Sequence, residues 1–250
     1  MLRKLLIALL AMIAMVPQLA FAQVEFPSTG GTGLDRIDHT LWDQITRRYV
    51  RDGLVDYDGA KADPRFEHYL AVLDGADLTI QASYEARLAF WINAYNALCI
   101  QVVLTEYPDL GSVRDLWFFF KRTFYRAGGR DVSLDLIEHE ILRTMGEPRI
   151  HFAIVCASFS CPNIQAWAYT PAGVDSQLTV AAESFVNSRK GLIVDRAASV
   201  ARFSMIFSWF GADFEASGGV PAFAPRYAVN EADVDFLRSG GFKVEYQEYN

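Results

Sequence analysis

The feature that most constrains the fold is a long apolar segment between Ser83 and Pro108. Serine is a favoured N-cap residue, and Pro108 stops a helix that continues to about Thr105. Between them, the block Leu88–Ile100 carries apolar side chains on nearly every side of the helix. Because such a helix has no polar face to turn toward water, the sequence predicts that it forms the centre of a large core.

Two asparagines interrupt this apolar helix. With successive residues turned by about 100°, Asn93 and Asn96 fall on the same stripe as two alanines and one glutamate. A buried amide without hydrogen-bond partners costs on the order of 1–3 kcal/mol, so both side chains need partners. Two interpretations remain open: the amides hold the backbone of a neighbouring loop, or they belong to a catalytic site.

Helix and strand signals alternate along the rest of the chain. Periodic apolar residues, caps and breakers predict further helices over residues 38–50, 64–73, 133–145, 176–188 and 207–210. Strands are predicted on both sides of Gly128-Gly129, at 149–156, as a pair within 191–204, and at 244–249. We therefore predict one compact domain of α/β class (α+β type), in which the central helix packs on a mixed or antiparallel sheet.

The segment most suggestive of chemistry is Arg149–Pro162. Its residues 150–155 are apolar apart from His151, which predicts a buried strand. A small polar turn then carries Cys156 and Cys161. Because rigid backbone at the end of a strand presents side chains to a cleft, Cys156 is the better nucleophile candidate. Cys161, directly before a proline, is the better candidate for a structural or disulfide partner.

Three chemistries compete for these two thiols. A Cys156–Cys161 disulfide is sterically feasible at a turn, and an exported protein meets oxidising conditions. Redox enzymes typically use Cys-x-x-Cys, whereas the spacing here is Cys-x4-Cys. Nucleophilic catalysis requires a thiolate, a base and a group that orients the base. The third cysteine, Cys99, lies in the apolar helix and is expected to be an inert core residue.

Glu138 and His139 are the main acid–base candidates. Glu138 falls in the apolar stripe of the predicted helix 133–145, where a carboxylate needs a partner or a raised pKa. The adjacent imidazole of His139 is well suited to proton transfer near neutral pH. A buried ion pair between Glu138 and an arginine is the structural alternative. His151, inside the predicted strand, is interpreted as a satisfied core residue.

Metal and cofactor signals are weak. The two cysteines of the turn and nearby histidines could supply zinc ligands, but their spacing is not typical of zinc sites. No motif indicates a nucleotide or redox cofactor. We therefore predict no cofactor and no metal.

Residues 1–22 have the pattern of an export signal. A basic pair precedes an apolar run over residues 5–16, and Ala-Phe-Ala at 20–22 forms a small-x-small cleavage site. The apolar run is too short to span a bilayer, so we expect no stable membrane insertion. We expect a periplasmic or secreted protein, with a flexible lead-in over residues 23–34 and a single globular domain over 35–250.

The charge of the mature chain limits its partners. Residues 1–22 hold two of the 23 basic residues and none of the 30 acidic ones, so their removal changes the formal net charge from −7 to −9. Nucleic acids and anionic membranes are bound by clustered lysine and arginine. An acidic chain without a lysine-rich run therefore favours a small-molecule or peptide substrate over a nucleic acid.

Three blocks of the chain resemble the family called domain of unknown function 547. They are Ala89–Leu98, Ile137–Arg143 and Pro148–Pro162, within a motif core over residues 84–215. The family pattern around the first cysteine of the turn resembles Asn-Cys-Gly-Ala-Arg-Ser-Cys-Pro. Here Val155, Ala157 and Phe159 replace its Asn, Gly and Arg, which removes polar or anion-binding groups from this turn.

The combination of Cys, His and Asn is similar in kind to papain-like and transglutaminase-like thiol enzymes. In those enzymes the nucleophile usually precedes the histidine in sequence. Here His139 precedes Cys156, so this resemblance implies a fold with a permuted order of the catalytic elements.

Our leading hypothesis is an exported thiol-dependent hydrolase or acyl/peptidyl transferase that acts on an amide or acyl bond. In it Cys156 attacks, His139 is the base, and backbone N–H groups of residues 157–160 stabilise the oxyanion. Three residues are candidates for orienting the imidazole or polarising the substrate: Asn93, Asn96 and Glu138. The alternative is a non-catalytic periplasmic binding or interaction domain with a structural Cys156–Cys161 disulfide.

Overall fold

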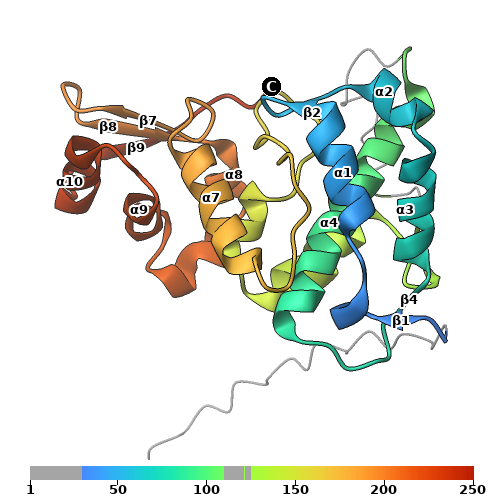
Figure 1. The fold of residues 1–250 in the computed structure, drawn as a ribbon. Helices are drawn as coiled ribbons and strands as arrows, with labels where there is room; N and C mark the ends of the chain where they lie inside the picture. Colours follow the sequence, from blue (N-terminus) through green and yellow to red (C-terminus); the bar gives the residue numbers. More distant parts are fainter. Residues whose placement is uncertain (1–29, 110–120, 122–124) are drawn as a thin grey trace, which may run out of the picture.

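The computed structural model describes residues 30–109, 121 and 125–250 (Figure 1). Its α-helices are α1 Thr40–Tyr49, α2 Tyr57–Ala62, α3 Pro64–Asp74, α4 Tyr84–Glu106, α6 Leu134–Leu136, α7 Val174–Val186, α8 Met205–Trp209, α9 Val220–Phe223 and α10 Glu231–Ser239. Its strands are β1 Thr32–Gly33, β2 Val50–Arg51, β3 Leu54–Val55, β4 Ala76–Asp77, β5 Tyr125–Ala127, β6 Arg130–Val132, β7 Leu192–Asp195, β8 Val200–Phe203 and β9 Lys243–Tyr246. Short 3₁₀ or π segments are η1 Leu34–Arg36, η3 Ile137–Leu142, η4 Arg143–Met145, η5 Pro148–Phe152, η6 Gly211–Ser217 and η7 Ala224–Arg226. The predicted export signal at 1–22 lies outside the described residues.

Helix α4 forms the centre of the larger core, as predicted. The Ser83 hydroxyl accepts a hydrogen bond from the Ala86 N–H, and the helix ends at Glu106, before Pro108. Its main contacts are with helical elements: η1, α2, α3, α6, η3 and α7. The predicted single domain of mixed helices and strands is confirmed, while α4 itself is surrounded by helices rather than by a sheet (Figure 1).

The hydropathy of α4 follows from this central position. By length and composition alone the helix could cross a membrane, since its most apolar 18-residue window has a mean hydropathy of 1.5. Of that window, 83% is buried inside the protein. A helix enclosed on all sides by other elements requires apolar residues on all faces.

The three-stranded sheet covers a second core. Strand β8 pairs antiparallel with β7 and parallel with β9, so the sheet is mixed. Beneath it lie six buried phenylalanines: Phe152, Phe185, Phe203, Phe207, Phe214 and Phe223. Beyond β9, the Gln247 N–H still donates to the Phe203 carbonyl, and this pairing guides the last residues toward the turn after Cys156.

Residues 150–155 are buried, as predicted, but the strand prediction is wrong. Pro148–Phe152 is a 3₁₀ helix, and the Glu147 carboxylate accepts a hydrogen bond from an N–H of its first turn. Proline favours this start because its φ is already helical. A short apolar run fits a buried strand and a buried helix equally well, so the pattern could not separate them. Ile150 packs in the core around α4 and Phe152 in the phenylalanine-rich core, which fixes the segment between the two.

The predicted helix 133–145 is continuous, but it passes from an α-helical turn to a π turn and then to a 3₁₀ turn. The Ser133 hydroxyl accepts a hydrogen bond from the first turn, and Gly146 ends the helix with a left-handed φ of 74°. Between them, Ile137–Leu142 is a π turn, in which a backbone hydrogen bond spans five residues instead of four. Such turns are frequent at functional sites, and both acid–base candidates lie in this one.

Of the remaining predictions, the hairpin is confirmed and the boundary of the lead-in differs from the structure. The hairpin around Gly128 and Gly129 is confirmed, with φ of 62° and 70° at its two central residues. Thr32 and Gly33 pair with β4, so the ordered domain includes the end of the predicted lead-in 23–34. Helices α2, α9 and α10 have no counterpart among the predictions, because α2 and α9 span only six and four residues and acidic residues interrupt the apolar positions of α10.

Candidate functional site

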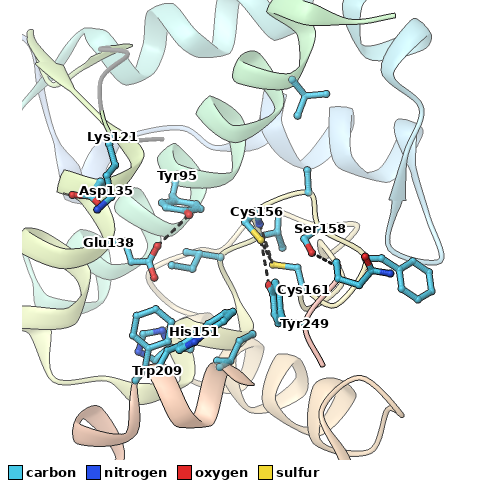
Figure 2. A pocket seen from close by; sticks show the side chains of 18 of the residues that line it. Tyr95, Lys121, Asp135, Glu138, His151, Cys156, Ser158, Cys161, Trp209 and Tyr249 are labelled. Carbon is cyan, nitrogen blue, oxygen red and sulfur yellow. Dashed lines mark hydrogen bonds and ion pairs between the residues drawn. The ribbon is translucent and has the colours of Figure 1, made fainter. Parts of the chain in front are cut away.

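A pocket of about 1180 Å³ opens beside the turn that carries Cys156 (Figure 2). Its wall brings together residues from the π turn, η5, the cysteine turn, α8 and the last residues of the chain: Glu138, His139, His151, Cys156, Trp209 and Tyr249. These residues are spread over more than a hundred positions of the sequence. The pocket therefore depends on how both cores pack together.

The Cys156 sulfur lies 3.0 Å from the Cys161 sulfur and 3.3 Å from the Tyr249 hydroxyl (Figure 2). Both cysteines are free thiols; Cys156 is half-buried and Cys161 is buried. Hydrogen bonding from the Cys161 thiol lowers the pKa of Cys156 to about 6; burial opposes this, while the Tyr249 hydroxyl and the Ser158 N–H support it. Burial raises the pKa of Cys161. At neutral pH, Cys156 is therefore the thiolate and Cys161 a thiol donor.

The turn after Cys156 begins with a strained residue. Ala157 has a φ of 57°, which costs a residue other than glycine about 1–2 kcal/mol. Ala157→Gly removes this strain. It also raises the conformational entropy of the unfolded chain, which lowers the stability by about 0.4–1 kcal/mol. We expect the free energy of unfolding to rise by up to about 1 kcal/mol, measured by urea denaturation. Ser199→Gly, at φ 55° in the turn between β7 and β8, should give a similar gain without changing Cys156 alkylation. Lower stability of Ala157→Gly would contradict this.

The two asparagines of α4 bind backbone. The Asn96 amide donates to the Ala153 carbonyl at 2.9 Å and accepts from the Val155 N–H at 3.0 Å. Asn93 makes the same pair of bonds to the backbone of Tyr169, at 2.7 and 2.9 Å. Neither asparagine is part of the pocket wall. These contacts match the structural interpretation of both amides, and Asn96 fixes the residue directly before Cys156.

The His151 imidazole is held in place by a hydrogen bond to Asp213 and by stacking on Phe210. Its Nε2 lies 2.7 Å from Asp213 Oδ2, and its ring stacks on Phe210 with centroids 4.0 Å apart. Burial acts to raise the pKa of Asp213. The hydrogen bonds that it accepts from Arg143 and His151 outweigh this effect and hold the pKa of Asp213 below its usual range. Burial lowers the pKa of His151, so the imidazole is neutral and donates its single proton to Asp213. Its Nδ1 has no hydrogen-bond partner among the described residues and keeps a basic lone pair.

His139 is arranged differently. Arg143 donates from Nη1 to His139 Nδ1 at 3.0 Å, because a guanidinium can only donate. The neutral ring then carries its proton on Nε2, which lies 3.7 Å from Asp135 Oδ1. Arg143 also forms a bidentate pair with Asp213, at 2.7 and 2.8 Å. In this arrangement Nδ1 of His139 is occupied by Arg143, whereas Nδ1 of His151 has no partner among the described residues.

Glu138 enters the pocket from the π turn. Its Oε2 accepts a hydrogen bond from the Tyr95 hydroxyl at 3.2 Å (Figure 2). Burial raises the pKa of Glu138; the nearby His139 and the Tyr95 hydroxyl act in the opposite direction. A buried carboxyl with a raised pKa can supply a proton to a reacting group.

The structure thus brings Cys156, Cys161, Glu138 and His139 to one pocket and leaves Asn93 and Asn96 outside it. Sequence reasoning assigned His151 to the core and did not consider Asp213 or Tyr249. The available signal for Asp213 is an acid inside an aromatic run, between Phe210 and Phe214. Within residues 30–109, 121 and 125–250, no group of three or more His, Cys, Asp or Glu side chains is placed to hold a metal ion.

Comparison with known proteins gives one match. Residues 80–186 match the family model described as "Protein of unknown function, DUF547". The matched segment runs from the approach to α4 to the end of α7 and contains Cys156 and His151, whereas Asp213 and Tyr249 lie beyond it. No curated protein and no solved structure gives a significant match to the chain.

Proposed function

We propose that this chain, which belongs to the DUF547 family over residues 80–186, is an exported thiol-dependent hydrolase or acyl transferase with Cys156 as its nucleophile. The observation that carries the proposal is that one pocket is lined by both a low-pKa thiolate and a neutral, carboxylate-bound imidazole. Thiolates attack acyl carbons directly, so Cys156 needs no base for the first step.

The first step transfers an acyl group to sulfur. The Cys156 thiolate attacks the acyl carbon, a thioester forms, and the bond to the leaving amine or alcohol breaks. The leaving group takes a proton from water or from Glu138, a carboxyl in the pocket wall whose pKa is raised by burial. One N–H of the turn is turned toward an oxygen acceptor, because the Ser160 N–H donates to the backbone oxygen of Asn250 at 3.0 Å. An N–H of this kind suits the developing oxyanion.

The second step releases the acyl group. His151 Nδ1 takes a proton from water, or from an acceptor alcohol or amine, as this molecule attacks the thioester carbon. The carbon–sulfur bond breaks and returns Cys156 as a thiolate, and the proton on His151 passes to solvent or back to Glu138. Asp213 keeps the imidazole in the tautomer that this step requires.

The thiolate is tested by the pH dependence of alkylation. The rate of Cys156 alkylation by iodoacetamide is expected to rise with pH through a midpoint near 6, because only the thiolate reacts. Cys161→Ala removes the main hydrogen bond to sulfur, so this midpoint should move up by at least about one pH unit, toward the ordinary value of about 8.5. Cys99→Ala, which removes a buried cysteine outside the pocket wall, is the control and should leave the profile unchanged. A wild-type midpoint near 8.5 would refute the activated thiolate.

The short distance between the Cys156 and Cys161 sulfurs favours a second candidate function. The Cys156 and Cys161 sulfurs are 3.0 Å apart, close enough to oxidise to a disulfide with little movement of the turn. In that state the chain would be a non-catalytic periplasmic binding or interaction domain. Intact mass of the protein from its native compartment, with and without reductant, separates the two. A quantitative Cys156–Cys161 disulfide that reduction does not convert into activity would select the binding domain.

A further inference from the structure

The chain's own segment Glu248–Asn250 lies across the turn beside Cys156. The Ser160 N–H donates to the backbone oxygen of Asn250 at 3.0 Å, and the Asn250 N–H donates to the Ser160 hydroxyl at 2.9 Å. The Ser158 hydroxyl donates to the same oxygen. The turn therefore binds both the N–H and the backbone oxygen of the last residue of the structure, and proteins recognise peptide segments through main-chain contacts of this kind.

The side chain of Tyr249 occupies the space in front of the nucleophile. Its hydroxyl lies 3.3 Å from the Cys156 sulfur, and its ring lies 4.7 Å from that of Trp209 (Figure 2). Trp209 is 53% exposed, so its ring is accessible to an aromatic group of a ligand in the way that it contacts Tyr249. Together, the two serines and Trp209 form one surface, which binds main chain on one side and an aromatic ring on the other.

We propose that this surface of Ser158, Ser160 and Trp209 is a peptide-binding subsite, in which residues 248–250 lie where an extended peptide with an aromatic residue binds. The inference rests on the proposed function and deepens it: the acyl or amide bond that Cys156 attacks belongs to a peptide or a peptide-containing substrate. The occupant is itself a peptide segment, bound through its N–H and its backbone oxygen, and this favours a peptide over a sugar or a lipid that carries no amide group.

The tether explains why the segment occupies the subsite. A short segment joined to β9 has an effective concentration on the order of millimolar, so it outcompetes a free peptide of similar affinity. The sheet does not depend on the segment, because β9 ends at Tyr246 and the last main-chain pairing to β8 is made by Gln247. Ending the chain after Gln247 should therefore open the subsite and leave the fold intact.

The test is calorimetric titration with acetyl-Gln-Glu-Tyr-Asn-amide. The peptide is expected to bind the chain ended after Gln247 at least about tenfold more tightly than the full chain. A peptide with alanine in place of its tyrosine should lose at least about tenfold in affinity for the shortened chain. Tyr249→Ala in the full chain is the second variant and should also bind the tyrosine peptide more tightly. Tyr246→Ala, an exposed aromatic residue on β9, is the matched control and should bind as weakly as the full chain.

Equal affinity for the full and opened chains, or no binding to any of them, would overturn the proposal and make residues 248–250 a structural closure of the pocket. Urea denaturation shows whether the shortened chain is folded, and Tyr249→Ala decides the question if it is not. Binding does not depend on the reactivity of Cys156. The subsite and the proposed acyl transfer can therefore fail independently.

Discussion

Cys156→Ala is expected to abolish hydrolysis of the probe ester p-nitrophenyl acetate, and His151→Gln to lower its steady-state kcat, which includes release of the acyl group, by about 10²–10⁴-fold. The alanine variant lacks the sulfur that ionises most easily among the described cysteines of the pocket wall. Glutamine can still donate to Asp213 from its amide, but it carries no basic nitrogen for the second step. Release of p-nitrophenol measures turnover, and urea denaturation shows whether each variant is folded.

His139→Gln is the matched control. Because His139 Nδ1 already accepts from Arg143, its loss should change the steady-state kcat by less than about tenfold. The opposite ranking, with His139→Gln inactive and His151→Gln active, would restore His139 as the base that the sequence predicts. Equal activity of Cys156→Ala and wild type would end the thiol mechanism altogether.

Asn96→Ala is expected to lower the free energy of unfolding by about 3 kcal/mol. It leaves two buried backbone groups without partners, the Ala153 carbonyl and the Val155 N–H, at about 1–3 kcal/mol each. The variant also removes the hydrogen bond that fixes Val155, the residue before Cys156. We therefore expect the midpoint of Cys156 alkylation to move from about pH 6 to a higher pH. Urea denaturation and the iodoacetamide profile measure the two effects.

Asn187→Ala provides the comparison for Asn96. The Asn187 amide also binds backbone on both sides, donating to the Tyr227 carbonyl and accepting from the Val229 N–H. It is exposed, so water replaces the lost contacts, and we expect a loss below about 1 kcal/mol. Equal losses at the two positions would show that burial does not set the cost at Asn96.

The central helix and its asparagines show how far sequence reasoning reaches. The extent of α4 could be predicted because a proline, a serine cap and apolar residues on every face are local signals. That Asn93 and Asn96 must be satisfied was predictable from the cost of burying an amide. The identity of their partners was not, because those backbone groups lie 57 to 76 positions away in the chain.

The acid–base assignment shows where sequence reasoning stops. Glu138 and His139 were found because an acid and an imidazole in an apolar helix are conspicuous. His151 was placed in the core, and the structure does bury it. Its proposed role as a base depends on Asp213, which is 62 residues further along, and on Arg143, which binds the other candidate imidazole, that of His139.

By itself, the sequence determined the mixed helix–strand domain, the buried central helix and the turn in which Cys156 is the reactive candidate. These follow from local periodicity, caps and the cost of burying polar groups. The tertiary structure alone decided that residues 148–152 wind into a 3₁₀ helix, that His151 faces the pocket with Asp213 behind it, and that Tyr249 covers the sulfur. The physical reason is distance along the chain: the pKa of a thiol and the tautomer of an imidazole are set by neighbours that only the packing of two cores brings into contact.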